Sequence, residues 1–245
     1  MSDEKKVTFV TGGASGIGKA VCFELSSKGE SLIIADIDES KGVDTCKKIL
    51  SNGGEAIFQK VDVRKRNEIR HASDTGLKEF GKITGLVNCA GLVTMTSLDE
   101  LTEEEWDLVV DVNLKGTWLT TQEVSRDIAA AGGGAVVNIS TVEAEVVVSS
   151  KGYCQVHYNA SKGGVKMLTK ALSVELAKKS IRVNAVAPGP IATDFVSLEG
   201  ITAPETLEDL KTRLLIPRVG LPEDVAKAVR FLLSEEASWI TGIHL

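Results

Sequence analysis

Histidine and paired cysteine are scarce in this chain of 245 residues. It has three histidines, and its four cysteines, Cys22, Cys46, Cys89 and Cys154, stand far apart with no CxxC pair among them. A zinc site requires a cluster of such ligands, and a disulfide framework requires cysteines at regular spacing. The sequence therefore supports neither a metal site nor a disulfide-stabilised secreted protein.

Net positive charge and long hydrophobic runs are also missing. The chain has 28 lysines and arginines against 34 aspartates and glutamates, a formal net charge of −6. This balance provides no broad positive field for nucleic acid or an anionic membrane. The N-terminal stretch MSDEKKVTFVTGG is charged, and its apolar part is too short for a signal peptide or a membrane span. We expect a cytoplasmic protein that binds no nucleic acid and no membrane and recognises a small molecule.

What the chain does have is a regular alternation of short β-branched runs with helical segments. The runs are VTFVT (7–11), SLIIAD (31–36), AIFQKVDV (56–63), GLVNCAG (85–91), AVVNIS (135–140) and IRVNAVAP (181–188). This alternation is typical of βαβ units around a parallel sheet, and no low-complexity linker divides it. We predict an α/β fold, a single doubly wound Rossmann-type domain over residues 1–245 with a central parallel sheet flanked by helices. The irregular connection at about 189–215 is predicted to be a substrate lid.

A glycine-rich turn, TGGASGIG, follows the first run directly. Gly12, Gly16 and Gly18 let the backbone turn sharply and approach a pyrophosphate, whose charge the start of the next helix favours. Asp36 ends the second run, where a carboxylate can accept hydrogen bonds from the adenosine ribose hydroxyls. That carboxylate would repel a 2′-phosphate, and Ile37 supplies no positive charge to neutralise one. The pattern predicts NAD as the cofactor in preference to NADP.

Tyr158 and Lys162 are four residues apart in YNASK, so they project from one face of a predicted helix. A free tyrosine ionises near pH 10, and a phenolate near pH 7 requires a shift of roughly 3 units, or about 4 kcal/mol. We predict that the ammonium of Lys162 supplies much of this shift and that the oxidised nicotinamide adds to it. Ser140, at the end of the fifth run, can donate to the substrate oxygen. Tyr158 would then deprotonate an alcohol as hydride leaves for the nicotinamide.

Seven motifs in order extend these features over essentially the whole chain. TGGASGIG, Asp62-Val63, NCAG (88–91), Asn113, Ser140, YNASK (158–162) and PGPIATD (188–194) together resemble the classical short-chain dehydrogenases/reductases. The resemblance implies that Asn113 supports a proton relay from Lys162, which also binds the nicotinamide ribose. The implied catalytic residues are Asn113, Ser140, Tyr158 and Lys162. The implied cofactor-binding residues are Gly12, Ser15, Gly16, Ile17, Gly18, Asp36, Asp62, Val63, Asn88, Ala90, Gly91, Tyr158, Lys162, Pro188, Ile191 and Thr193.

The sequence departs from the family pattern in the segment between Ser140 and Tyr158, which is longer than usual. It carries Glu143 and Glu145 among apolar residues. A carboxylate facing the pocket would disfavour an anionic substrate and bind hydroxyls or an amine; alternatively, one or both carboxylates face solvent. At the other end of the chain, SWITGIHL resembles the start of the family's final strand.

These features predict an NAD-dependent oxidoreductase that acts on a secondary alcohol or its ketone. One alternative is reduction of a 3-oxoacyl thioester on an acyl carrier protein, and a non-enzymatic alternative is a protein that only senses NAD. The resemblance also implies a homo-oligomer, a tetramer or dimer, in which long helices within 102–131 and 156–178 pack between subunits.

Overall fold

The apolar runs form one parallel sheet. The computed structural model describes residues 5–148, 154–193, 208, 212, 214–216 and 218–245. Over these residues the strand order is β3-β2-β1-β4-β5-β6, with every neighbouring pair parallel. The strands are β1 (Val7–Thr11), β2 (Ser31–Asp36), β3 (Glu55–Lys60), β4 (Gly85–Asn88), β5 (Gly134–Ile139) and β6 (Ile181–Val186). The predicted doubly wound α/β fold is confirmed.

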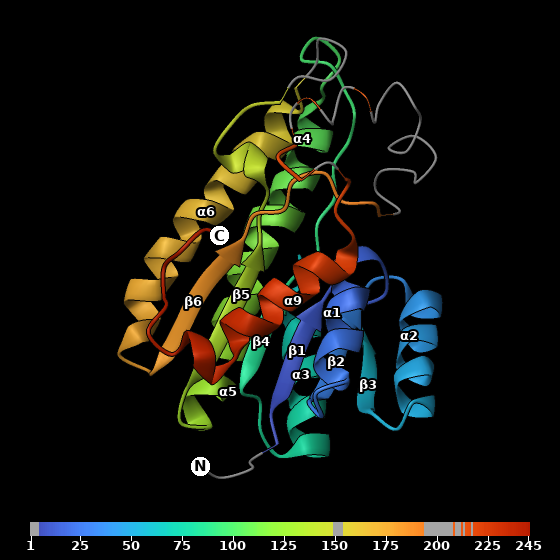
Figure 1. Cartoon of the computed structure of the whole chain (residues 1–245), viewed down its shortest axis with the longest axis vertical. Coiled ribbons are helices and arrows are strands. Elements are labelled where there is room, and N and C mark those ends of the chain that lie inside the picture. The colour runs from blue at the N-terminus through green and yellow to red at the C-terminus, as the bar shows by residue number, and fades with distance from the viewer. Residues whose placement is uncertain (1–4, 149–153, 194–207, 209–211, 213, 217) are drawn as a thin grey trace.

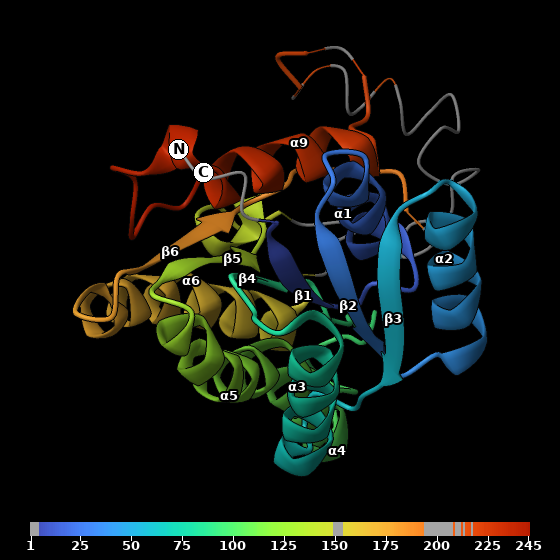
Figure 2. The same cartoon turned by 90° about the horizontal axis from the view of Figure 1, so that it is seen from below.

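Helices cover both faces of this sheet (Figures 1 and 2). On one face lie α1 (Gly16–Ser26), α2 (Glu39–Ser51) and α9 (Pro222–Leu233). On the other face lie α3 (Arg66–Phe80), α5 (Gly116–Ala130) and α6 (Val156–Ala177). A shorter helix, α4 (Glu103–Val110), leads through one π-helical turn (Asp111–Lys115) into α5. Asp38 caps the start of α2: its carboxylate accepts from the Lys41 amide at 3.0 Å and satisfies a backbone donor that the helix leaves free.

Adjacent strand residues point to opposite faces, so each strand contributes to two cores. Val10 and Ile34 pack in the cluster beneath α1 and α9, whereas Phe9 and Ile33 pack in the cluster beneath α3 and α5. All four side chains are fully buried. The near-continuous apolar character of β1 and β2 is thus explained by a sheet that is covered on both faces.

The order of the strands reverses at β1. From β1 the chain adds β2 and β3 on one side and β4, β5 and β6 on the other. In open parallel sheets a ligand binds at such a reversal, beyond the carboxyl ends of the strands. In Figure 1 the strands end toward α4, so this edge is where the polar motifs at the ends of β1, β2, β4 and β5 meet.

Four strands end earlier than the sequence predicts, and after two of them side chains bind the amides that a longer strand would use. The run 56–63 leaves the sheet near Asp62, whose amide donates to the Glu68 carboxylate at 2.8 Å. The run 85–91 ends as a strand at Asn88, because the Cys89 and Ala90 amides donate to Thr11 Oγ1 at 3.1 and 3.2 Å. The runs 135–140 and 181–188 likewise end as strands at 139 and 186. The motif residues just beyond each strand therefore lie in loops at the ligand-binding edge.

The last residues of the chain lie along β6. The Ala185 amide donates to the Ile243 carbonyl at 2.9 Å, and the Leu245 amide donates to the Ala185 carbonyl at 2.9 Å. The final strand expected from SWITGIHL is present as a single parallel bridge between Ala185 and His244. Most of the predicted lid at 189–215 lies outside the described residues. Within the described part of the chain, no helix is long and apolar enough to cross a membrane.

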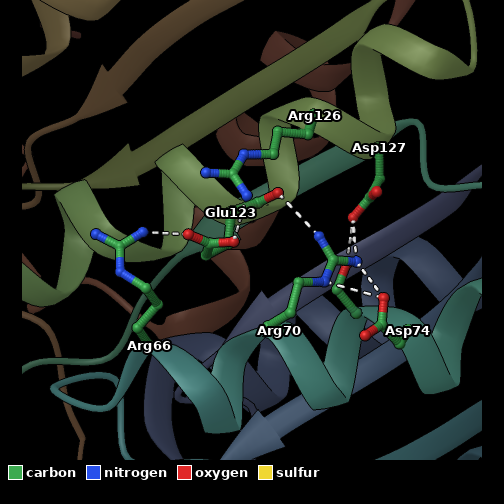
Figure 3. A network of polar contacts seen from close by, with 7 residues as sticks. Arg66, Arg70, Asp74, Glu123, Arg126 and Asp127 are labelled. Atoms are coloured by element: carbon green, nitrogen blue, oxygen red, sulfur yellow. Dashed lines mark hydrogen bonds and ion pairs between the residues drawn. The ribbon is translucent and has the colours of Figure 1, made fainter.

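A network of ion pairs joins α3 to α5 (Figure 3). The Glu123 carboxylate is only 3% exposed; it pairs with Arg66 and, at 3.0 Å, with Arg126. Beside it, Arg70 bridges Asp74 at 2.8 Å and Asp127 at 2.7 Å. Arg66 and Arg126 are themselves 41% and 58% exposed, so the carboxylate is the group that loses most hydration on folding.

We expect that replacing both Arg66 and Arg126 by alanine destabilises the protein. The double variant leaves the Glu123 carboxylate buried without its two cations, which costs about 3 kcal/mol and lowers the melting temperature by about 6–12 °C. The control is Lys178→Ala, which removes an ion pair with Glu175 in which both side chains are 74% exposed. Equal melting temperatures for the double variant and the control would contradict a stabilising role for the network.

Candidate active site

The glycine turn between β1 and α1 is shaped for a close approach of the backbone. Gly12 has a φ of +67°, which side chains disfavour. A Cβ at Gly18 would lie 2.0 Å from the Gly12 carbonyl oxygen, so only glycine allows α1 to start this close to β1. No side chain of the described residues caps the first turn of α1, and the turn itself contains no acidic residue. These features fit a bound anion such as a pyrophosphate.

A pocket of about 440 Å³ lies beside this turn. It is lined by Ser15 and Gly16 of the turn and by Thr193 from the segment after β6. Lys19 and Lys41 also line it. The pocket and the glycine turn together fit the pyrophosphate part of a dinucleotide, with Ser15, Gly16 and Thr193 among the residues that would lie beside it.

Asp36 lies where the sequence predicts, at the end of β2 beside the turn. One carboxylate oxygen accepts from the Ala14 amide at 2.9 Å, and the other accepts from the Asp38 amide at 2.9 Å. These two bonds fix the orientation of the carboxylate. Each oxygen can accept a further hydrogen bond, so a ribose hydroxyl can still be bound.

Asn113 lies in the π-helical turn and is completely buried. Its amide nitrogen donates to the Leu92 carbonyl at 2.9 Å and to Ser161 Oγ at 3.1 Å, and its Oδ1 accepts from the Leu92 amide at 2.8 Å. A Cβ at Gly91 would lie 3.1 Å from Asn113 Oδ1 and 3.5 Å from Lys162 Nζ. The structure therefore brings together the motifs that contain Gly91, Asn113 and Lys162.

Ser140 and Lys162 meet where β5 ends against α6. The Ser140 hydroxyl donates to the Lys162 carbonyl at 3.3 Å, and Lys162 Nζ donates to the Ile139 carbonyl at 2.8 Å. Lys162 Nζ lies 5.9 Å from the centroid of the Tyr158 ring. Three of the four predicted catalytic residues, Asn113, Ser140 and Lys162, are buried, and Tyr158 is partly exposed.

The pKa of Tyr158 differs from the sequence-based expectation. Burial, followed by the negative charge of Glu143, raises the pKa of Tyr158 to about 12, although a hydrogen bond with the Thr141 hydroxyl acts in the opposite direction. Burial also lowers the pKa of Lys162 to about 8. Desolvation of the phenol therefore opposes the predicted shift toward pH 7 in the protein without a nicotinamide, and the contribution of Lys162 to that shift stays a prediction.

The remaining predicted cofactor residues surround this centre. Asp62 is held by Arg64, with contacts of 2.7–3.1 Å, and that guanidinium lowers the pKa of its carboxyl. Val63 is buried beside Gly116. The side-chain amide of Asn88 donates to Thr121 and Asn138, both at 2.9 Å, and so joins the sheet to α5.

The other predicted cofactor residues lie at the two ends of the site. Ile17, in α1, packs against the core. After β6, the Pro188 carbonyl accepts from the Val142 amide at 3.0 Å, and Ile191 forms a parallel bridge with Gly220. Contacts of these residues with a cofactor stay predictions.

Two threonines near the centre were missed by the sequence analysis. Thr11 ends β1, and its hydroxyl holds the Cys89 and Ala90 amides. Thr141 follows Ser140 directly and contacts the Tyr158 hydroxyl. The only signal for either residue in the sequence is its position at the carboxyl end of a strand that leads into the site.

The two loop carboxylates have different surroundings. Glu145 is exposed and pairs with Lys166 and, at 3.0 Å, with His244. Glu143 is partly buried, and its Oε2 is enclosed. The expectation that one or both face solvent holds for Glu145 only. No group of acidic, cysteine or histidine side chains among the described residues could hold a metal ion.

Known proteins with similar sequences and structures support this picture. A family model described as Enoyl-(Acyl carrier protein) reductase matches residues 12–245. Cyclopentanol dehydrogenase of Comamonas sp. is 37% identical over 240 residues, which are 98% of this chain and 94% of that protein. The 3-oxoacyl-(acyl-carrier-protein) reductase FabG of Thermotoga maritima is 37% identical over 239 residues, with 98% and 94% covered. A solved structure of a short-chain type dehydrogenase/reductase from Mycobacterium ulcerans has a TM-score of 0.92 at 31% identity, with 100% of this chain and 88% of that chain covered.

The strand order, the glycine turn and these similarities define a Rossmann-type oxidoreductase that uses a nicotinamide cofactor. More particularly, the chain belongs to the short-chain dehydrogenase/reductase family.

Proposed function

We propose that this protein is an NAD(H)-dependent oxidoreductase that interconverts a secondary alcohol and its ketone. The observation that carries the proposal is the placement of Tyr158 and Lys162 beside Ser140, at the strand edge that also holds the glycine turn and Asp36. When bound, the nicotinamide supplies the hydride acceptor or donor. The relative that is named a cyclopentanol dehydrogenase supports a small secondary alcohol as the substrate class.

In this proposal the residues of the chain orient the substrate and move one proton. When a substrate binds, the Ser140 hydroxyl turns from the Lys162 carbonyl to the carbinol oxygen, donates a hydrogen bond to it and holds it next to the Tyr158 hydroxyl. The Tyr158 phenolate accepts the hydroxyl proton in alcohol oxidation, and the phenol returns it in ketone reduction. Lys162 is an ammonium at neutral pH, because its pKa lies at about 8. The charge of Lys162 favours the phenolate. Asn113 is held by hydrogen bonds to Leu92 and Ser161, and it would support the proton relay that leads from Lys162.

The direct experiment is to incubate the purified protein with NAD and a panel of secondary alcohols and to measure NADH absorbance. We expect turnover of at least one small cyclic or acyclic secondary alcohol. No turnover of any alcohol, together with measurable binding of NAD, would favour the alternative of an NAD-sensing protein.

The second candidate is reduction of a 3-oxoacyl thioester, because the reductase from Thermotoga maritima is as similar to this chain as the alcohol dehydrogenase. A carrier-protein reductase needs exposed basic side chains to dock its acidic partner. Arg126, one candidate for this role, is paired with Glu123 here. Faster reduction of an acetoacetyl thioester than of any simple ketone would decide for the reductase.

The rate of alcohol oxidation is expected to rise with pH. The active form of Tyr158 is the phenolate, which is present only above its pKa, and burial raises the pKa of the free-protein phenol to about 12. With NAD at saturation, the logarithm of kcat/KM for the alcohol should therefore increase with a slope of about 1 at pH values below the pKa of Tyr158 in the protein–NAD complex. Initial rates in buffers of constant ionic strength measure this slope. A rate that is independent of pH would show that Tyr158 is not the base.

We also propose that the chain forms one domain with a lid at about 189–215 and that the protein is cytoplasmic. We further propose that it assembles into a dimer or tetramer. The partly exposed Trp106 and Trp118, at 40% and 39% exposure, lie on α4 and α5, the helices expected to pack between subunits. Size-exclusion chromatography with light scattering measures the assembly. A monomer at micromolar concentration would refute it.

A further inference from the structure

Glu143 is fixed beside the catalytic residues by the end of β5. It lies three residues after Ser140, in a short 3₁₀ turn (Val142–Ala144). The Glu143 amide donates to Thr141 Oγ1 at 3.3 Å, and the Val142 amide donates to the Pro188 carbonyl at 3.0 Å. These bonds hold the backbone of Glu143 between Ser140 and the segment predicted to contact the nicotinamide.

One oxygen of the Glu143 carboxylate is buried without a partner in the described part of the chain. Oε2 is buried, and no donor among the described residues reaches it. Burial raises the pKa of this carboxyl, in keeping with a charged group that has lost water and gained no hydrogen bond. A buried oxygen that makes no hydrogen bond is destabilising, so Oε2 favours a ligand that brings a hydrogen-bond donor.

The Glu143 charge also acts on the catalytic phenol. It is the second cause, after burial, of the raised pKa of Tyr158. The reacting carbinol oxygen must lie at the Tyr158 hydroxyl, so a substrate placed there comes close to Glu143 as well. Glu145 provides the contrast, because Lys166 and His244 already satisfy it at the surface.

We propose that Glu143 accepts a hydrogen bond from a second donor group of the substrate, a hydroxyl or an ammonium on a carbon next to the carbinol carbon. This inference rests on the proposed alcohol dehydrogenase function and names its substrate class: vicinal diols and amino alcohols, together with the corresponding hydroxy and amino ketones. The donor satisfies Oε2, and a substrate with a carboxylate in that place is repelled. A site that is built to bind a donor rejects an analogue without one, because its own polar group is then left unpaired.

The test compares matched substrates with NAD. For a cyclopentane and a butane skeleton, kcat/KM is measured for the vicinal diol, its monomethyl ether and the amino alcohol. The ether keeps the neighbouring oxygen, removes its donor and adds one methyl group. We expect wild type to prefer the diol or the amino alcohol over the ether by about 10-fold or more, and we expect Glu143→Ala to reduce that ratio to about 1.

Two further variants identify the donor and control for the loop. In Glu143→Gln the amide oxygen still accepts from a hydroxyl, but the charge that favours an ammonium is lost. A preference for the diol should survive in this variant, whereas a preference for the amino alcohol should fall. Glu145→Ala removes the exposed carboxylate of the same loop and should keep the wild-type ratios.

Melting temperatures provide a readout that does not depend on turnover. Because Glu143→Ala removes an unsatisfied buried oxygen, its melting temperature should equal or exceed that of wild type. Equal kcat/KM for diol and ether in wild type, a preference unchanged in Glu143→Ala, or a marked loss of stability in both Glu143 variants would overturn the inference. In each of those outcomes NADH formation by wild type leaves the proposed function intact. No NADH formation from any alcohol would overturn both.

Discussion

Replacing Tyr158 by phenylalanine is expected to lower kcat for alcohol oxidation by about 1,000-fold or more, within the range that a positioned acid or base contributes. The variant keeps the ring that Lys162 faces at 5.9 Å and removes only the hydroxyl. It also relieves the burial of a polar group, so the protein should fold and melt like wild type. Rates of NADH formation with the alcohol that wild type turns over fastest provide the measurement.

The controls for this experiment are cofactor affinity and folding. NAD binding, followed by the quenching of tryptophan fluorescence, should change little in Tyr158→Phe, because the glycine turn and Asp36 are untouched. A kcat within a few-fold of wild type would remove Tyr158 from the mechanism. A large loss of NAD affinity would show that the Tyr158 hydroxyl acts mainly in cofactor binding, the other role that the resemblance implies for this residue.

Wild type is expected to use NAD in preference to NADP by about 100-fold or more in kcat/KM, since two nearby like charges in a partly buried site repel by several kcal/mol. Asp36 is held in place by the Ala14 and Asp38 amides, so it cannot easily turn away from a 2′-phosphate. In Asp36→Asn the side chain keeps one acceptor for these amides and loses its charge. This variant should accept NADP, and most of the discrimination should disappear.

If the protein instead preferred NADP, two lysines would be the reason. Lys19 and Lys41 line the pocket beside the phosphate turn, and either ammonium could pair with a 2′-phosphate. A wild-type preference for NADP that is lost in Lys41→Ala or Lys19→Ala would contradict the role assigned to Asp36. Neither alanine variant should alter kcat with NAD.

The fold could be predicted from the sequence because each apolar run has the composition of a buried strand and the order of the runs matches a parallel sheet. Buried strands such as VTFVT and SLIIAD are apolar on both faces, and the glycine turn follows the first of them. The ends of the strands were less predictable, since they depend on distant partners. Glu68 binds the Asp62 amide, and Thr11 binds the amides after β4, and neither contact has a signature in the neighbouring residues.

The composition of the site was predictable from the order of its motifs, but its electrostatics were not. The spacing of Tyr158 and Lys162 indicates that they are neighbours, yet it says nothing of how much water each loses. Desolvation depends on everything packed around the pair, and it raises the pKa of the phenol and lowers that of the amine. The difference between Glu143 and Glu145, two residues apart, has the same origin, because only Glu145 meets Lys166 and His244 from distant parts of the chain.

The proposed mechanism depends most on one expectation, that an oxidised nicotinamide bound beside Lys162 makes Tyr158 more acidic. The most direct measurement is a titration of tyrosinate by ultraviolet difference absorbance, with and without NAD, using Tyr158→Phe to subtract Tyr153, the other tyrosine of the chain. Without NAD, Tyr158 should stay protonated below pH 10, since its pKa is about 12. With NAD, its titration should move to lower pH by about 2 units or more. A Tyr158 titration that is the same with and without saturating NAD would contradict the account.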